Sequence, residues 1–153
     1  MNQALITALT AVGTAQLLKR PIRIWRNQDT GPQDLLGSGG MPSAHSSGAA
    51  ALASFTALRY GIRTPEFAIA AMLGIIVMYD AMNLRRHTGE IAIQVNDLDS
   101  HVEALAGHHP DIHHKRRKQE LEERIGHQPE EVLGGALLGT AIGAASALFI
   151  RHT

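Results

Sequence analysis

The sequence contains no cysteine, few aromatic residues and no excess of charge of either sign. The absence of cysteine excludes disulfide bonds, iron–sulfur clusters, thiol nucleophiles and zinc sites with cysteine ligands. Lysine and arginine together number 14, as do aspartate and glutamate, so the formal net charge is zero. A protein that binds nucleic acid by neutralising phosphates over a broad surface needs an excess of cations. We therefore expect no nucleic-acid partner.

Charge is absent from four stretches of the chain, although the mean hydropathy is only −0.05. The last of them, residues 132–150, has nineteen uncharged residues, close to the roughly 20 that cross a bilayer. Residues 4–18, 46–58 and 67–78 are shorter, and each alone also fits a buried helix of a soluble protein. Together the four stretches predict an all-α membrane bundle of about four spans, built as a single domain over residues 1–153.

Glycine recurs at a fixed interval within the last neutral stretch. Gly135, Gly139 and Gly143 are each four residues apart, so they share one face of a helix. Glycine on one face lets two helix backbones approach closely, which is common between helices in lipid. The interval predicts a packing surface for another helix, and an Ala/Gly-rich helix in a soluble bundle is the alternative.

A long polar stretch, residues 83–131, precedes the last neutral stretch. Its first part has apolar residues at intervals of four, three, four and three, namely Ile91, Val95, Leu98, Val102 and Leu105. This spacing predicts an additional amphipathic helix, which would lie on the membrane surface or cover the site. Residues 115–124 carry opposite charges four apart, which predicts a second, charged helix.

Positive charge is unevenly divided between the two sides of a four-span bundle. The connections 19–45 and 83–131 lie on one side and hold eleven of the fourteen lysines and arginines. Arg59, Arg63 and Arg151 lie on the other side. Because cytoplasmic loops carry the excess of cations, we expect an integral protein of a bacterial plasma membrane with its site on the cytoplasmic face.

The first of three polar clusters, residues 39–47, reads Gly-Gly-Met-Pro-Ser-Ala-His-Ser-Ser. Paired glycines allow backbone amides to converge on an anion, and Pro42 and Ser43 are typical of a helix start, whose dipole favours phosphate. His45 would then lie in the first turn, beside the anion. A glycine turn followed by a capping serine is the simpler alternative.

The second cluster, residues 126–132, contains His127 and Glu131. A carboxylate four residues after a histidine can accept the proton of one imidazole nitrogen and leave the other nitrogen free to attack. An exposed loop histidine is the alternative.

The third cluster, residues 78–87, contains Asp80, Arg85 and Arg86. A carboxylate at the edge of an apolar span is costly unless it is paired. Spacings of five and six residues are unfavourable for a pair within one helix. By charge, Arg85 and Arg86 are the obvious partners of Asp80. Lys19 or a histidine across the bundle is the alternative. With either partner we expect Asp80 to support the site.

Taken in order, these segments resemble a small, divergent branch of the superfamily of type 2 phosphatidic acid phosphatases and vanadium-dependent haloperoxidases. The superfamily pattern is Lys-x6-Arg-Pro, Pro-Ser-Gly-His and Ser-Arg-x5-His-x3-Asp. Lys19 and Arg26 match the first motif, with Asn27 in place of proline. Residues 42–45 match the second motif, with Ala44 in place of glycine. The resemblance covers about residues 15–145.

The third motif is matched only at its end. His127 and Glu131 have the motif's spacing, with glutamate in place of aspartate. No arginine stands at the expected place upstream of His127, and Arg85 or Arg86 is the expected substitute. Of the two, Arg86 is our preferred prediction.

The resemblance implies a membrane phosphoric monoester hydrolase that acts on a lipid phosphate or a polyprenyl (pyro)phosphate. It implies that His127 is the nucleophile that forms a phosphohistidine, that Glu131 holds it, and that His45 protonates the leaving alkoxide. The phosphoryl oxygens would be bound by Lys19, Arg26, Gly40, Ser43 and Arg85 or Arg86. No metal or other cofactor is required, and vanadate should inhibit.

Several histidines lie between residues 101 and 114, at His101, His108, His109, His113 and His114. Asp111 is the single carboxylate within residues 107–118, so we expect a polar surface loop and no metal site. A lipid-phosphate-binding or transport protein without catalysis and a structural membrane component are the alternative functions. The sequence leaves open whether the chain forms a homo-oligomer.

Overall fold

The computed structural model describes residues 2–27, 40–108, 119–123 and 125–151. These residues form helices and no strand. The elements are α1 (Gln3–Trp25), α2 (Ala44–Tyr60), α3 (Pro65–Met82), α4 (Leu84–Ala106) and α5 (Pro129–Arg151). The all-α class is confirmed.

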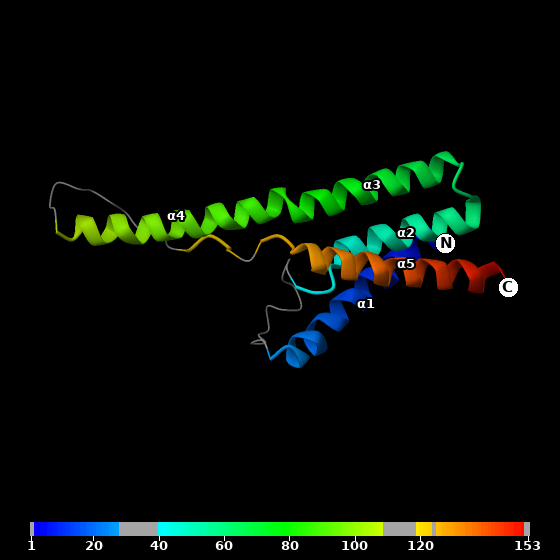
Figure 1. Ribbon diagram of the computed structural model, residues 1–153, viewed down its shortest axis with the longest axis horizontal. Coiled ribbons are helices and arrows are strands. Elements are labelled where there is room, and N and C mark those ends of the chain that lie inside the picture. Colours follow the sequence, from blue (N-terminus) through cyan, green and yellow to red (C-terminus); the bar gives the residue numbers. More distant parts are fainter. Residues whose placement is uncertain (1, 28–39, 109–118, 124, 152–153) are drawn as a thin grey trace.

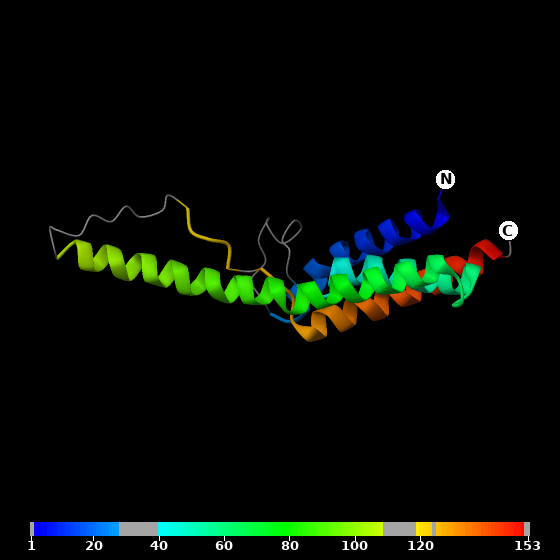
Figure 2. The ribbon, with the colours of Figure 1, turned by 90° about the horizontal axis from the view of Figure 1, so that it is seen from above.

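Four of the helices form a bundle, and α4 extends out of it. Figures 1 and 2 show α1, α2, α3 and α5 alongside one another, with both chain ends at the end of the bundle farthest from α4. α4 continues α3 in nearly the same direction after a break at Asn83, so the two helices form one long rod. α4 includes all five residues of the predicted amphipathic face, which confirms the additional helix.

Helix α2 packs against α5 through the glycines that the sequence singled out. Gly135, Gly139 and Gly143 lie so close to α2 that a Cβ atom on any of them would overlap its backbone. The carbonyl groups they face belong to Ser43, Ser47 and Ala51, which are also four residues apart. The predicted packing surface is therefore confirmed, with α2 as its partner.

The interior of the bundle is made of small side chains. Nine of the eleven buried hydrophobic residues in the described chain are alanines, and the other two are Phe55 and Val132. Large apolar side chains point outward instead, among them Ile69, Met72 and Ile76 of α3 and Leu137 and Phe149 of α5. Soluble proteins bury such residues, whereas small residues at helix interfaces are typical of bundles in lipid.

Two helical segments are long and apolar enough to cross a membrane, by length and composition alone. They are Pro65–Ala106, which combines α3 with α4, and Pro129–Ile150 of α5. α1 and α2 belong to the same bundle but do not meet this criterion among the described residues. The bundle of about four helices agrees with the expected fold class, and the count of four spans stays a prediction.

The prediction of a charged helix over residues 115–124 is wrong for residues 119–123, the described part of that range. Residues 119–123 run without helical structure beside α4, and the predicted residues 115–118 and 124 lie outside the described part. The side chain of Asn96 bonds to both backbone groups of Leu121, at 3.0 Å each. Tertiary hydrogen bonds to α4 thus replace the local bonds that a helix would form.

Replacing Gly139 with alanine should destabilise the fold. Alanine normally stabilises a helix by roughly 1 kcal/mol relative to glycine, but here its Cβ would overlap the Ser47 carbonyl, and overpacking costs about 1–3 kcal/mol. Gly13→Ala is the matched control, because nothing lies within 4 Å of a Cβ there. Unfolding in mixed micelles should show a loss for Gly139→Ala and none for Gly13→Ala. Equal stabilities would contradict the close α2–α5 contact.

Candidate active site

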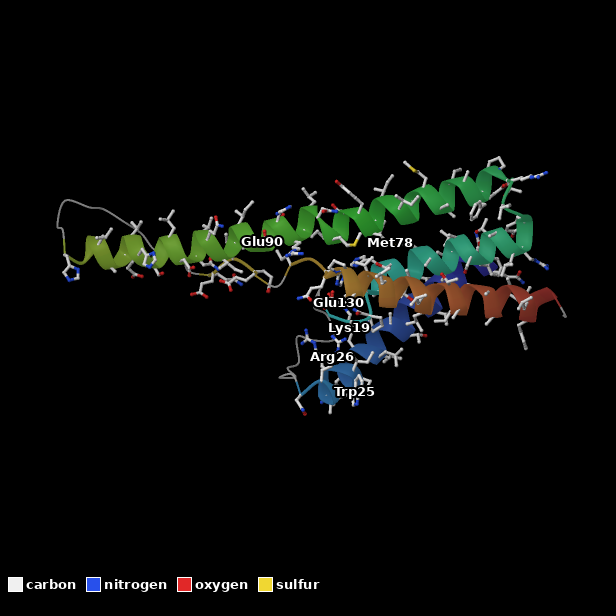
Figure 3. The ribbon with its side chains drawn as sticks, in the orientation of Figure 1. Lys19, Trp25, Arg26, Met78, Glu90 and Glu130 are labelled. Atoms are coloured by element: carbon white, nitrogen blue, oxygen red, sulfur yellow. The ribbon has the colours of Figure 1, made fainter. Side chains whose placement is uncertain are left out.

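The polar clusters meet at the end of the bundle from which α4 departs. The backbone N–H of Ser43, just before α2, donates to the carbonyl of Glu131 in the first turn of α5 at 2.9 Å. The N–H of His127 donates to the carbonyl of Ala81 in α3 at 3.0 Å. Lys19 of α1 lies at the same end, where Figure 3 labels it close to Glu130. Four segments distant in sequence therefore form one site.

His127 is held in a defined orientation by Glu131. Its Nδ1 lies 2.9 Å from the Glu131 carboxylate, which also accepts the backbone N–H of Gln128 at 3.2 Å. The His127 side chain is only 2 % exposed. Because the carboxylate accepts a proton from Nδ1, the neutral ring carries its lone pair on Nε2.

The Nε2 atom of His127 is buried and has no hydrogen-bond partner among the described residues. A buried polar atom without a partner costs roughly 1–3 kcal/mol. Such unsatisfied groups are rare in folded proteins, and a catalytic role is one of their accepted explanations. One ring nitrogen is fixed and the other has no partner among the described residues, which is the arrangement that a nucleophilic histidine requires.

The loop that carries His127 is pressed against the junction of α3 and α4. Gly126 has a φ of 100°, a conformation that side chains rarely adopt. A Cβ there would also come within 2.7 Å of the Arg86 backbone. Glycine at this position therefore brings His127 and Arg86 together.

His45 faces His127 across the site. The two ring centroids are 6.2 Å apart and the rings are inclined by 60°. His45 precedes the neutral stretch of α2, and burial lowers its pKa below the usual 6.5, an effect that the positive charge of Arg85 strengthens. The two rings are therefore neighbours, although His45 is not among the described residues that line the cavity beside His127.

Lys19 supplies a buried positive charge. The residue is only 2 % exposed. Burial lowers the pKa of its ammonium group, while the negative charge of Glu131 acts in the opposite direction. In its charged form, the buried Lys19 therefore places an ammonium group on the Glu131 side of the site.

The two candidate arginines of the α3–α4 junction point to different places. Arg85 pairs with Asp80 at 2.8 Å, and its charge acts on His45. Arg86 pairs with Glu90 at 3.2 Å and lines a cavity together with His127. Of the two, Arg86 shares the cavity wall with His127. Binding of phosphate by either arginine stays a prediction.

Asp80 pairs with Arg85, one of its two expected arginine partners, although a spacing of five is unfavourable for such a pair within one helix. The spacing argument assumed that one regular helix runs through Asp80 and Arg85. The helix is interrupted at Asn83, where α3 ends and α4 begins, and this break lets residues five apart meet. Asp80 therefore orients Arg85, although its charge also reaches His45.

Arg26 lies away from the cavity, at the C-terminal end of α1. Its guanidinium contacts the sulfur of Met41 at 3.2 Å, and Figure 3 shows it beyond Lys19 along α1. Arg23 lines the cavity instead, and a Cβ on Gly40 would lie 3.5 Å from its Nη2. Sequence reasoning missed Arg23, although its spacing of four from Lys19 places both on one helix face.

Ser43 and Gly40 determine the backbone conformation just before α2. Ser43 is the N-cap of α2, and its hydroxyl accepts the N–H and the O–H of Ser46 at 3.4 and 3.0 Å. It is completely buried. Gly40 has a φ of 99° and lines the cavity. The predicted helix start is confirmed, while contact of either residue with phosphate stays a prediction.

The cavity beside His127 has a volume of about 590 Å³, which lies in the range of small-ligand sites. Its basic lining consists of Arg23 and Arg86, and Glu131 lies on its wall with His127. Further carboxylates line it as well, from Glu90, Glu123 and Glu130. The cavity therefore carries both positive and negative side chains.

No group of three histidine, aspartate or glutamate side chains is placed to hold a metal ion in the part of the chain that the structure describes. His101 and His108 are exposed on and after α4. The remaining histidines of the loop, His109, His113 and His114, lie outside the described residues, as does Asp111.

Known proteins match the chain over most of its length. A family model described as "Divergent PAP2 family" matches residues 1–142. A Bacillus subtilis (strain 168) protein named "Uncharacterized membrane protein YuiD" is 35 % identical over 151 residues, which cover 97 % of this chain and 96 % of the relative. No solved structure matches the chain. With the motif order found in the sequence and a family match that spans nearly the whole bundle, the chain belongs to the divergent PAP2 family.

Proposed function

We propose that the protein is a membrane phosphatase that hydrolyses a lipid phosphate monoester or a polyprenyl (pyro)phosphate through a phosphohistidine. The observation that carries this proposal is the state of His127. One of its ring nitrogens is fixed by Glu131 at 2.9 Å, and the other is buried without a partner. Family membership supports the same chemistry.

The proposed membrane location follows from the distribution of apolar residues. Alanine and glycine fill the interior, large apolar side chains cover the outside, and the relative from B. subtilis is named a membrane protein. The neutral stretches 4–18, 46–58, 67–78 and 132–150 would lie in lipid. Lys19, His45 and Glu131 flank these stretches, so the site lies at the depth of lipid head groups, and the positive-inside rule assigns it to the cytoplasmic face of a bacterial plasma membrane.

In the first half of the reaction, the lone pair on Nε2 of His127 attacks phosphorus. The bond between phosphorus and the alkoxide oxygen breaks, and protonated His45 gives its proton to that oxygen. The products are an alcohol and a phosphoryl group on Nε2. The Nδ1 proton stays on the ring, where Glu131 stabilises the positive charge that develops.

In the second half, neutral His45 takes a proton from water while the water oxygen attacks phosphorus. The phosphorus–nitrogen bond breaks, and inorganic phosphate leaves with His127 restored. The transferred group carries negative charge throughout, so catalysis depends on cations fixed around it. Lys19, Arg23 and Arg86 are the proposed source of this charge.

The experiment that tests the function is a substrate screen with the purified protein in detergent. Release of inorganic phosphate is measured with phosphatidic acid, a polyprenyl phosphate, a polyprenyl pyrophosphate and a soluble sugar phosphate. We expect turnover of at least one lipid and inhibition by vanadate. Saturable lipid binding without phosphate release from any member of the panel would contradict the proposal and favour the non-catalytic lipid-binding protein.

Replacing Glu90 with glutamine should strengthen substrate binding. The change frees Arg86 from its exposed partner at 3.2 Å, and such a pair is worth about 0.5 kcal/mol, or roughly twofold in KM. Asp97→Asn is the matched control, because it removes the same charge two turns further along α4, outside the cavity. A KM unchanged by Glu90→Gln would argue that Arg86 does not contact the phosphoryl group.

A further inference from the structure

The apolar face of α4 has no partner within the described chain. Four large side chains on it are 56–67 % exposed and follow one another every seven residues, namely Leu84, Ile91, Leu98 and Leu105. Val95 and Val102 lie between them on the same face. Isolated exposed hydrophobic residues are common, but an apolar face that extends over six turns, interrupted at Thr88, marks an interaction surface. We refer to these six residues as the α4 stripe.

The opposite side of α4 is already occupied. Residues 119–123 and 125–126 return along it, fixed by hydrogen bonds between the Asn96 side chain and Leu121 and from that side chain to the Glu123 carboxylate. The Cα of Gly89 faces the carbonyls of Glu123 and Ile125. At 100° per residue, Gly89 and Asn96 point about 150° away from the middle of the α4 stripe. Packing among the described residues therefore leaves the stripe open.

Lipid does not fit as the partner of the α4 stripe. α4 continues the direction of α3 away from the bundle, as Figures 1 and 2 show. With α3 across the membrane, α4 therefore leaves the bilayer instead of lying in its plane, and this step rests on the membrane location proposed above. A rise of 1.5 Å per residue places Leu105 roughly 30 Å beyond Leu84. The stripe runs through water, where it needs a protein partner.

We propose that α4 pairs with α4 of a second copy of this chain in a parallel two-stranded coiled coil. The intervals of four and three place Leu84, Ile91, Leu98 and Leu105 at heptad position d and Val95 and Val102 at position a. β-Branched residues at a with leucine at d favour parallel dimers. Two copies inserted in one membrane with the same orientation also project their α4 helices in the same direction.

The residues beside the stripe are compatible with this pairing. In a parallel coil, position g of one helix approaches the next position e of the other. This brings Gln94 opposite the partner copy's aspartate at position 99, and His101 opposite alanine at position 106. No two like charges meet at these positions. A coil of two to three heptads is weak in dilute solution, but confinement to one membrane raises the effective concentration.

The dimer leaves the catalytic cavity accessible. Arg86, Glu90 and Ile93 line that cavity from α4. On the helical wheel their mean direction lies about 135° from the middle of the α4 stripe. Each copy would therefore carry a complete site on the outer side of the coil.

The proposal is tested by cysteine cross-linking, because the natural chain has no cysteine. Ile91→Cys, Leu98→Cys, Leu105→Cys and Ser100→Cys are made singly and oxidised in native membranes. The three stripe variants should form disulfide dimers at least about tenfold faster than Ser100→Cys, which points away, because only paired d positions bring both Cβ atoms within disulfide reach. Adding Leu98→Glu to Ile91→Cys should abolish its dimer, whereas Asp97→Glu should not.

Rates equal to that of Ser100→Cys would overturn the proposal. Cross-linking of Leu98→Cys alone would also overturn it, because it would indicate an antiparallel pair centred there. Phosphate release is measured on the same membranes before oxidation. Dimers without phosphatase activity would refute only the proposed function, and activity without dimers would refute only the coiled coil.

Discussion

His127→Ala should reduce phosphate release from every substrate to the background rate. Without the imidazole no phosphoryl-enzyme can form, so the loss does not depend on the leaving group. His127→Gln should fail equally, although its amide can still bond to Glu131 and preserve the packing. Both variants should retain the fold, because the backbone bond from residue 127 to the Ala81 carbonyl does not involve the side chain.

A phosphoryl-enzyme trap identifies His127 directly. Brief exposure to a substrate labelled in its phosphoryl group should transfer the label to the natural protein, in a linkage that acid breaks and base does not. His127→Ala should carry no label. His101→Ala is the matched control, since it removes an exposed histidine of α4 outside the cavity, and it should be labelled normally. Label on the His127→Ala protein would contradict the assignment of the nucleophile.

The parts of the fold that follow local rules could be predicted from the sequence. The glycines at intervals of four located the α2–α5 contact, and the apolar periodicity located α4. The cap of α2 at Ser43 followed from its residue type. These features depend on spacing along a single helix, which the sequence states directly.

The misses concern places where one segment meets another. A motif spacing of seven pointed to Arg26, but α1 ends at Trp25, and Arg23 inside the helix lines the cavity. Asp80 pairs with Arg85 because the helix breaks between them. Residues 119–123 are not helical because the Asn96 side chain bonds to the backbone of Leu121. Charge spacing along the sequence does not reveal such a long-range contact. Each miss reflects tertiary contacts that override a local pattern.

His45→Ala should slow the enzyme in a way that depends on the leaving group. A general acid contributes about 10²- to 10⁴-fold when the leaving oxygen needs a proton. An alkyl or polyprenyl phosphate needs that proton, whereas an activated aryl phosphate leaves as a stable anion. We therefore expect a large loss with the lipid substrate and a small one with the aryl phosphate. Equal losses would contradict the role of His45.

The pH dependence gives a second, independent test of His45. In the free protein, burial and the charge of Arg85 lower the pKa of His45 below 6.5, so its acidic form is lost as the pH rises through that lowered value. For the lipid substrate, kcat/KM, which reports the free enzyme, should therefore fall already below pH 6.5. A bound phosphate dianion stabilises the imidazolium, so kcat should fall only at higher pH. His45→Ala should lack both decreases, because no proton donor remains at that position to titrate. Unchanged profiles in His45→Ala would assign the ionisation to another group.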